Sequence, residues 1–309
     1  MARIEIVHST DYRYRNPVGL SRHRLMLRPR DSHDLRINHA SLSVDPKPSA
    51  IRWAHDVFNN SVCYLSFDPD LRTQRLSIVS TLDLTHYPIG ADLPPCSVDP
   101  AAELFPFSYE AQEIPDLARL AERQEPDPKR VVDAWARRFV SGRGEVQTLK
   151  LLADMTRAVR EELAYGARHE EGTQTAAETL ERGTGTCRDF AVVMMEAVRT
   201  LGFAARFVTG YLYEEDTRGE LRGGASTHAW CSVYLPGAGW VEYDPTNGLL
   251  AGQSLVRIAE TRTASQALPL SGGYFGGADD TLGMDVCVAV RSAPLAPARP
   301  ASAQERAAV

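Results

Sequence analysis

The sequence predicts an α+β fold, with a β-sandwich-like N-terminal domain followed by a core in which a helix packs on an antiparallel sheet. Within the first ninety residues, apolar and polar side chains alternate with the period of two that half-buried strands show, most regularly over residues 76–84. Several short strands without long helices are typical of a sandwich. Beyond residue 110, helical spacing comes first and strand-like runs follow, which predicts a separate mixed core.

Shifts in composition divide the chain further. We predict a β-rich domain over residues 1–88, a linker with short helices over 89–145, the core over 146–291 and a disordered tail over 292–309. The prolines between residues 88 and 106 fix φ at too many positions for a helix or a central strand, which favours a linker there. The tail consists of alanine, proline and charged residues, a composition that buries too little apolar surface to fold.

Charge and hydropathy limit the classes of partner. The net charge of −6 and the pI near 5.8 argue against nucleic-acid binding, which needs a basic surface. The first ten residues alternate in polarity and do not resemble a signal peptide, and no run approaches the ~18 apolar residues of a membrane span. We therefore expect a soluble, cytoplasmic protein that binds neither nucleic acid nor membrane.

Cysteines are scattered along the chain without C-x-x-C spacing. Their odd number and irregular spacing favour reduced thiols over a disulfide framework or a zinc site. Histidines and carboxylates do not cluster, and the acidic run at residues 214–216 lacks the spacing of a calcium loop. We expect neither a metal nor a cofactor. The cysteines are Cys63, Cys96, Cys187, Cys231 and Cys287.

Helical and strand-like patterns follow each other through the second part of the chain. Apolar side chains at four-residue steps predict the longest early helix, and Pro128 favours a helix start close to it. The helices expected before residue 183 cover 116–123, 128–139 and 148–163. The strands expected after residue 202 cover 205–212, 227–235 and 240–244.

A glycine turn at residues 183–190 opens a largely apolar helix that continues to residue 201, and the chain is organised around it. Thr186 is the expected N-cap, and Asp189 lies three residues later, where the acid of a capping box reaches back. Cys187 is then the first helical residue, where the helix dipole favours a thiolate over a thiol. A thiolate is a nucleophile. Considered alone, Cys187 also fits a small buried core residue.

Two histidines lie in the C-terminal half of the chain. His228 begins an ordered strand, whereas His169 lies in a polar loop, so His228 is the better base for a cysteine nucleophile. Asp244 ends the next strand and is the expected third group, which holds the imidazole tautomer. In isolation, His228 also fits a half-buried structural histidine, and Asp244 a turn former ahead of proline.

The relative orientation of His228 and Asp244 depends on the hairpin between them. Their separation is sixteen residues (244 − 228). A hairpin loop with an odd number of residues puts both side chains on one face of the sheet, whereas a four-residue loop at 236–239 puts them on opposite faces. Direct opposition requires a hairpin centred on Pro236 or a bulge nearby. The sequence leaves these registers open.

Four motifs in the second half of the chain carry a resemblance to a known family. They are Gly-Thr-Cys-Arg-Asp-Phe-Ala at 185–191, Ala-Arg-Phe-Val-Thr-Gly-Tyr-Leu at 205–212, His-Ala-Trp at 228–230 and Gly-Trp-Val-Glu-Tyr-Asp-Pro-Thr-Asn at 239–247. In this order they resemble the bacterial branch of the transglutaminase-like superfamily, over residues 145–250. The first ninety residues are similar to the β-rich region that precedes this core in the bacterial members.

The resemblance implies a papain-like α+β core with a Cys-His-Asp triad, which falls by motif on Cys187, His228 and Asp244. It implies acyl transfer through a thioacyl intermediate on amide bonds of a peptide or protein, including isopeptide bonds. We rank hydrolysis above cross-linking because water is always present. Trp230 and Tyr211 are expected to line the acyl site, although an aromatic side chain in a strand is more often part of the core.

The alternative is an interaction module that keeps this fold and has lost activity. Residues 256–263 lack the histidine and the Gly-Arg-Asp-Tyr-like run that usually follow in the family, and this favours the alternative. An intact set of cysteine, histidine and aspartate favours the enzyme, because drift is not expected to preserve such a set.

Overall fold

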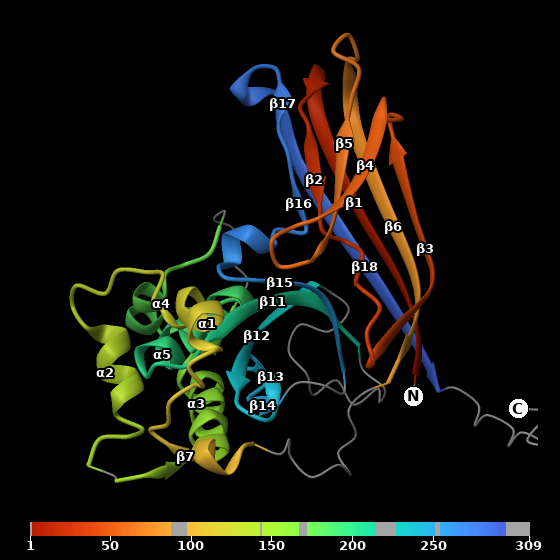
Figure 1. Ribbon diagram of the computed structural model, residues 1–309. Coiled ribbons are helices and arrows are strands. Elements are labelled where there is room, and N and C mark those ends of the chain that lie inside the picture. Colours follow the sequence, from red (N-terminus) through yellow and green to blue (C-terminus); the bar gives the residue numbers. More distant parts are fainter. Residues whose placement is uncertain are drawn as a thin grey trace, which may run out of the picture.

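The computed structural model describes residues 2–87, 98–142, 144–166, 172–213, 227–250 and 254–294. These residues form two packed units, a tall β domain built from both ends of the chain and a mixed core that carries the α-helices (Figure 1). The α+β class predicted from the sequence is confirmed.

The β domain is a sandwich of two antiparallel sheets. One sheet runs in the order β17-β1-β6-β3, with β18 also paired to β1, and the other runs in the order β16-β2-β5-β4. Leu25, Leu65 and Leu76 are buried between the sheets. The strands are β1 Ala2–Leu20, β2 His23–Leu25, β3 Leu35–Asp45, β4 Ala50–His55, β5 Ser61–Ser66, β6 Thr73–His86, β16 Leu270–Ser271, β17 Tyr274–Phe275 and β18 Thr281–Pro294.

The predicted C-terminal boundary of the core is wrong. We assigned residues 281–291 to the core and residues 292–309 to a disordered tail, but Thr281–Pro294 form β18, which pairs with β1 along thirteen registered positions. The cause is the edge of β1 that β6 leaves open, since a strand with alternating apolar residues completes the sheet there. Residues 295–309 lie outside the described residues, as do residues 88–97 of the predicted linker.

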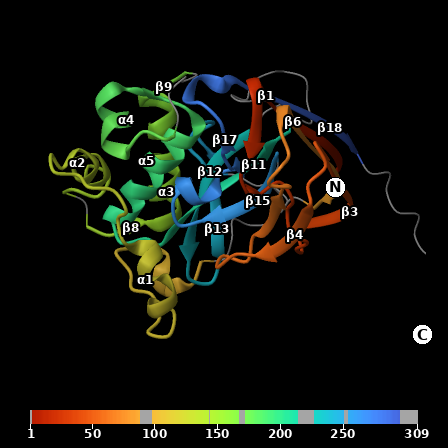
Figure 2. The same cartoon turned by 90° about the horizontal axis from the view of Figure 1, so that it is seen from above.

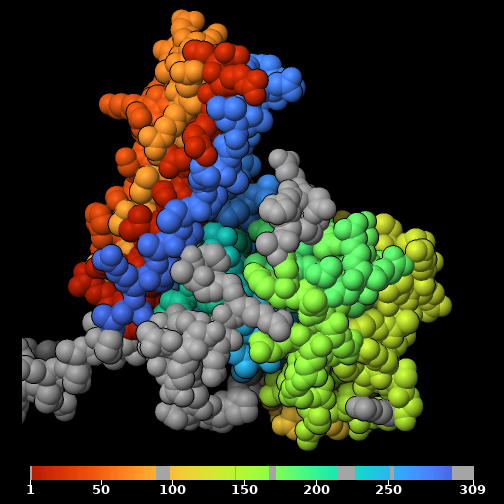
Figure 3. Space-filling view, turned by 180° about the vertical axis from the view of Figure 1, so that it is seen from behind, coloured from red at the N-terminus to blue at the C-terminus, as the bar shows by residue number. Residues whose placement is uncertain are grey.

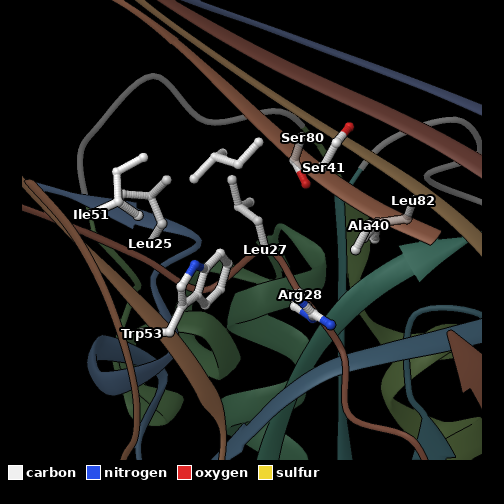
Figure 4. Close-up of a pocket in the computed structure, with 10 residues that line it drawn as sticks. Leu25, Leu27, Arg28, Ala40, Ser41, Ile51, Trp53, Ser80 and Leu82 are labelled. Atoms are coloured by element: carbon white, nitrogen blue, oxygen red, sulfur yellow. The ribbon is translucent and has the colours of Figure 1, made fainter. Parts of the chain in front are cut away.

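A cavity of about 210 Å³ opens between the two sheets of the β domain (Figure 4). Leu25, Leu27 and Leu82 give it an apolar lining, and the guanidinium of Arg28 lies 5.7 Å from the ring centroid of Trp53. All the lining residues belong to β-domain segments. The cavity is therefore separate from the cysteine helix of the core.

The main sheet of the core is antiparallel, in the order β14-β13-β12-β11-β15, and α5 packs against its strands β12 and β11. Two smaller sheets pair β7 with β8 and β9 with β10. α2, α3 and α4 surround the opposite side of α5, and the β domain lies across the sheet from the helices (Figure 2). The helices are α1 Ile114–Ala121, α2 Val131–Arg137, α3 Thr148–Glu162, α4 Ala176–Arg182 and α5 Cys187–Thr200. The strands are β7 Leu104–Phe105, β8 Val146–Gln147, β9 Ala164–Tyr165, β10 Thr184–Gly185, β11 Ala205–Leu212, β12 Thr227–Leu235, β13 Gly239–Asp244, β14 Leu249–Leu250 and β15 Leu255–Thr261.

β11 and β12 have the bounds expected from the sequence, but α2 and α4 differ from expectation. α2 begins at Val131 because the Asp127 carboxylate accepts from the Val131 N–H and Arg130 has a φ of 56°, which no helix allows. α4 was not predicted, although Thr175 and Glu178 form its capping box. No helix in the described ranges is both long and apolar enough to cross a membrane.

Two buried histidine–tyrosine pairs join the β domain to the core. Nδ1 of His8 lies 2.8 Å from the hydroxyl of Tyr211, and Nδ1 of His86 lies 2.8 Å from the hydroxyl of Tyr213. The apolar side chains of β1 and β6 pack around these pairs against β11 and β15. Burial lowers the pKa of His8 and of His86 from 6.5 to about 4. Both imidazoles are therefore neutral at neutral pH.

Because the pKa values of His8 and His86 are lowered in the folded protein, we expect the protein to lose stability in mild acid. The unfolded chain takes up a proton on each histidine near pH 6.5, whereas the folded protein resists protonation down to about pH 4. The free energy of unfolding should therefore fall as the pH drops through this window, by about 1–3 kcal/mol for each histidine. Urea unfolding at pH 7 and pH 5 measures it. His8→Gln should flatten the pH dependence, whereas His55→Gln, at an exposed position, should leave it as in the wild type; equal slopes for all three proteins would contradict the prediction.

Candidate active site

The structure places Thr186 at the N-cap of α5 and Cys187 at its first helical position. The carboxylate of Asp189 accepts from the backbone N–H of Thr186 at 2.8 Å and from its hydroxyl at 2.9 Å. Cys187 is 9% exposed, so its sulfur lies just beneath the surface. The backbone N–H groups of the first helical turn and the helix dipole stabilise negative charge at this position.

Asp189 is fully buried and holds the cysteine turn together. It also accepts from Gln174, from the backbone N–H at 2.7 Å and from the side-chain amide at 3.4 Å. The same amide donates to the carbonyl of Thr184 at 3.1 Å. A side chain at Gly185 would not fit, because its Cβ would lie 2.9 Å from the Cβ of Asp189. The sequence analysis missed Gln174, which lies in an aperiodic segment far ahead of the cysteine.

The hairpin of β12 and β13 sets the orientation of His228 and Asp244. Leu235 pairs with Gly239, so the loop has three residues and both side chains lie on one face of the sheet. The hairpin is thus centred on Gly237, which has a φ of 80°, and not on Pro236. In this register Asp244 is a diagonal neighbour of His228 on the adjacent strand.

Asp244 is 3% exposed and accepts hydrogen bonds from three residues. Its Oδ2 accepts from Nε2 of His228 at 2.9 Å and from Nδ2 of Asn247 at 2.8 Å, and its Oδ1 accepts from the backbone N–H of Thr246 at 2.9 Å. Burial raises the pKa of this carboxyl, but the hydrogen bond and charge of His228 and the Asn247 donors outweigh burial and lower it. Asn247 was quoted within a motif but was assigned no role from the sequence.

His228 is 1% exposed and lies between Asp244 and Cys187. Burial alone would lower the pKa of the imidazole, but its hydrogen bond to Asp244 and its electrostatic interactions with Asp244 and Cys187 raise it. The other ring nitrogen, Nδ1, makes no hydrogen bond of ordinary geometry to the described residues. Its interaction with the Cys187 sulfur is therefore longer or less well aligned than the hydrogen bond between Nε2 and Asp244. The site stabilises a charged imidazole.

Trp230 lies behind His228 and not in an open acyl site. The two rings are stacked, with centroids 6.0 Å apart and planes 24° apart, and the indole is fully buried. Its Nε1 donates to Oε2 of Glu242 at 2.9 Å. Gly210 makes room for it, since a Cβ there would lie 2.7 Å from the indole. The structure therefore differs from the expectation of substrate contact and gives Trp230 a supporting position.

Tyr211 also differs from expectation. Its side chain is 2% exposed, its hydroxyl is bound to His8, and its ring packs with the side chains of β1 and β6. These contacts direct it into the interface with the β domain. Neither aromatic side chain expected at the acyl site presents a surface that a substrate can reach.

In the described part of the chain, no group of three or more His, Cys, Asp or Glu side chains is arranged so that it could hold a metal ion. Cys63, Cys187, Cys231 and Cys287 are free thiols, and only Cys287 of these four is exposed. Cys96, His169 and the acidic run at 214–216 lie outside the described residues.

Comparison with known families covers both units of the fold. Residues 4–85 match the bacterial transglutaminase-like N-terminal region, and residues 133–245 match the transglutaminase-like superfamily. The chain belongs to this superfamily. Cys187, His228 and Asp244 all fall within the matched transglutaminase-like core.

Relatives of this transglutaminase-like protein extend over nearly its whole length. An uncharacterized protein of Mycobacterium tuberculosis is 28% identical over 303 residues, which cover 93% of this chain and 92% of the relative. One of Mycobacterium leprae is 25% identical over 297 residues, which cover 94% of this chain and 99% of the relative.

Among solved structures, a candidate cysteine protease from Cytophaga hutchinsonii has a TM-score of 0.66 at 21% identity. The alignment covers 96% of this chain and 93% of that protein. This last likeness shows that the fold of both units recurs together. The match over residues 133–245 places the core in the transglutaminase-like superfamily, a family of cysteine-dependent enzymes.

The capping boxes of α4 and α5 allow a matched test of Asp189. Asp189→Asn places an amide N–H₂ against the donors of Thr186 and Gln174 in a buried site, and should lower the free energy of unfolding by about 1–3 kcal/mol. Glu178→Gln makes the same change in the exposed box of α4 and should cost about 1 kcal/mol or less. Urea titration of both variants measures the difference, and an equal cost would show that Asp189 does not organise the turn.

Proposed function

We propose that this protein is a cysteine-dependent amide hydrolase that acts on peptide or protein substrates through a Cys187–His228–Asp244 triad. The observation that carries the proposal is the buried imidazole of His228, bound to Asp244 through Nε2 and coupled to the Cys187 sulfur on its other side. An imidazole held by a carboxylate on one side, with a cysteine at the first position of a helix on the other, is the arrangement that a nucleophile and its base require.

The acylation step follows from this arrangement. The Cys187 thiolate attacks the carbonyl carbon of the amide and forms a C–S bond, while the imidazolium of His228 gives its proton to the departing nitrogen as the C–N bond breaks. The product is a thioester on Cys187. Asp244 keeps the imidazole in the orientation that serves both transfers. The backbone N–H of Cys187 is the proposed donor to the oxyanion, a contact typically worth ~3 kcal/mol.

Deacylation completes the reaction. His228, now neutral, takes a proton from water as the water oxygen attacks the thioester, and the C–S bond breaks to release a carboxylic acid and the thiolate. An amine in place of water would give a new amide and thus a cross-link. We rank hydrolysis first because water needs no second binding site.

The reactivity of Cys187 can be compared with that of Cys287 in the same molecule. Cys187 is 9% exposed and Cys287 is exposed, so access alone favours labelling of Cys287 by iodoacetamide. If His228 and the helix dipole stabilise a thiolate, Cys187 should instead react the faster near pH 6, by about tenfold or more. Peptide mass spectrometry after timed quenching gives both rates. Asp244→Asn should slow Cys187 selectively, and labelling that follows exposure alone would remove the case for an activated thiol.

Turnover is tested on a mixture of peptides from a proteolysed cell extract, with new peptide termini and glutamine deamidation counted by mass spectrometry. Wild-type protein should generate one of these products, Cys187→Ala should generate none, and Asp244→Asn should reduce the rate by roughly 10²–10⁴-fold. A dansylated amine included in the reaction should stay free. Incorporation of the amine into peptides would show that the enzyme transfers acyl groups to amines and would contradict hydrolysis as the main reaction. The absence of any Cys187-dependent product would favour the inactive interaction module.

A further inference from the structure

β18 forms a long strand at the edge of the β domain. It pairs with β1 from Ala2↔Pro294 to Tyr14↔Thr281, and no described strand pairs with its other edge. Figure 3 shows β18, in blue, running across the surface of this face of the molecule. An edge of this length offers a row of backbone N–H and C=O groups to another strand.

The sequence of β18 does little to prevent such pairing. Natural edge strands are commonly protected by lysines, internal prolines or short length, whereas β18 has fourteen residues, no lysine and no proline before its last position. Its apolar side chains on the inner face of the sheet also remain uncovered, because the opposing sheet does not extend over them. Leu282 is 54% exposed, Met284 is 52% exposed and Val286 is 48% exposed. This strand is thus open both along its edge and on one face.

The charges on the outer face of β18 are complementary to those of a second copy of the same strand. Asp285 lies opposite Asp11 of β1 in the register. Its Oδ2 forms an ion pair with Nη2 of Arg13 at 2.6 Å. Arg291 lies opposite Glu5 and forms no ion pair within the described part of the chain. If a second β18 pairs antiparallel about Val288, Asp285 of each copy lies directly opposite Arg291 of the other. Opposite charges at directly opposed positions stabilise an antiparallel pair.

This register matches both faces of the strand. On the outer face Asp285, which also pairs diagonally with Arg13, faces Arg291 of the second copy, and that Arg291 in turn lies opposite Glu5 of its own β1. On the inner face it brings Val286 opposite Val290 and places Val288 opposite its own counterpart, so apolar residues cover each other. A shift by one residue would place Asp285 opposite Val290 or Ser292 and lose both ion pairs.

We infer that this protein forms a two-fold symmetric homodimer through antiparallel β18–β18 pairing centred on Val288. The paired edges join the two β domains into one continuous sheet and leave the Cys187 site on separate arms of the dimer. An isologous interface of this kind closes on itself, because each β18 edge is consumed by the other, and it therefore stops at two copies. The inference is independent of the proposed reaction.

Charge reversal tests the register. Asp285→Arg places like charges opposite each other in a homodimer, and so does Arg291→Asp, so each variant alone should sediment as a monomer where the wild type sediments as a dimer. A mixture of the two variants restores both Asp–Arg pairs and should sediment as a heterodimer. This rescue distinguishes a lost interface from a folding defect. A wild-type monomer throughout a dilution series, or a mixture that stays monomeric after the single variants dissociate, would overturn the inference.

Disulfide trapping supplies a second measurement. In a Cys287→Ser background, Val288→Cys puts two thiols directly opposite each other across the two-fold axis and should give a covalent dimer on mild oxidation. Val286→Cys in the same background is the matched control, since it faces Val290 of the second copy and should remain monomeric on a denaturing gel. Equal cross-linking of the two variants, or preferential cross-linking at residue 286, would rule out the proposed register.

Discussion

A buried imidazole whose charged form is stabilised is the constraint on which the rest of the core depends. Desolvation of a charge is costly unless hydrogen bonds and an opposite charge compensate for it. His228 receives both from Asp244, which in turn accepts from Asn247 and from the backbone of Thr246. The three-residue loop of the β12–β13 hairpin makes this possible, because a change of one residue in its length would carry Asp244 to the opposite face of the sheet. The ionisation of His228 therefore depends on the length of the β12–β13 turn.

The support of His228 continues into the β domain. Trp230 stacks on the imidazole and donates to the buried carboxylate of Glu242, which is paired with Arg257 of β15; Arg257 also reaches Asp34 of the β domain at 3.2 Å. Arg257 lies in the segment 256–263, which departs from the usual family pattern. That departure therefore falls at the contact between the two units and on the contacts that lie behind His228.

The sequence predicted those parts of the molecule whose contacts are local. The cysteine turn, β11 and β12 were found at their expected positions because a cap, a glycine or a period of two specifies each of them within a few residues. The place of Tyr211 was not found because it depends on His8, 203 residues away in the chain. Gln174, the place of Trp230 and the hairpin register were not found although their partners are closer in sequence, since no periodic pattern specifies which residues pair. Aromatic residues near a catalytic histidine fit a substrate site and a core equally well until the opposing sheet is known. The role of β18 was missed for the same reason, as its alternation gives no indication of which strand it joins.

The return of β18 to β1 makes the core an insertion between two parts of one sandwich. β1 and β6 come from the start of the chain, β16, β17 and β18 come from its end, and the whole core lies between them in sequence. Neither sheet of the sandwich is complete without the C-terminal segment, so the β domain cannot reach its final form before that segment is available, and its pairing is among the least local in the fold. The strand that completes this side of the sheet also has an edge that no other described strand covers. Closing a sandwich with the two ends of the chain thus fixes the core at both of its junctions, and it exposes the surface through which a second copy would be bound.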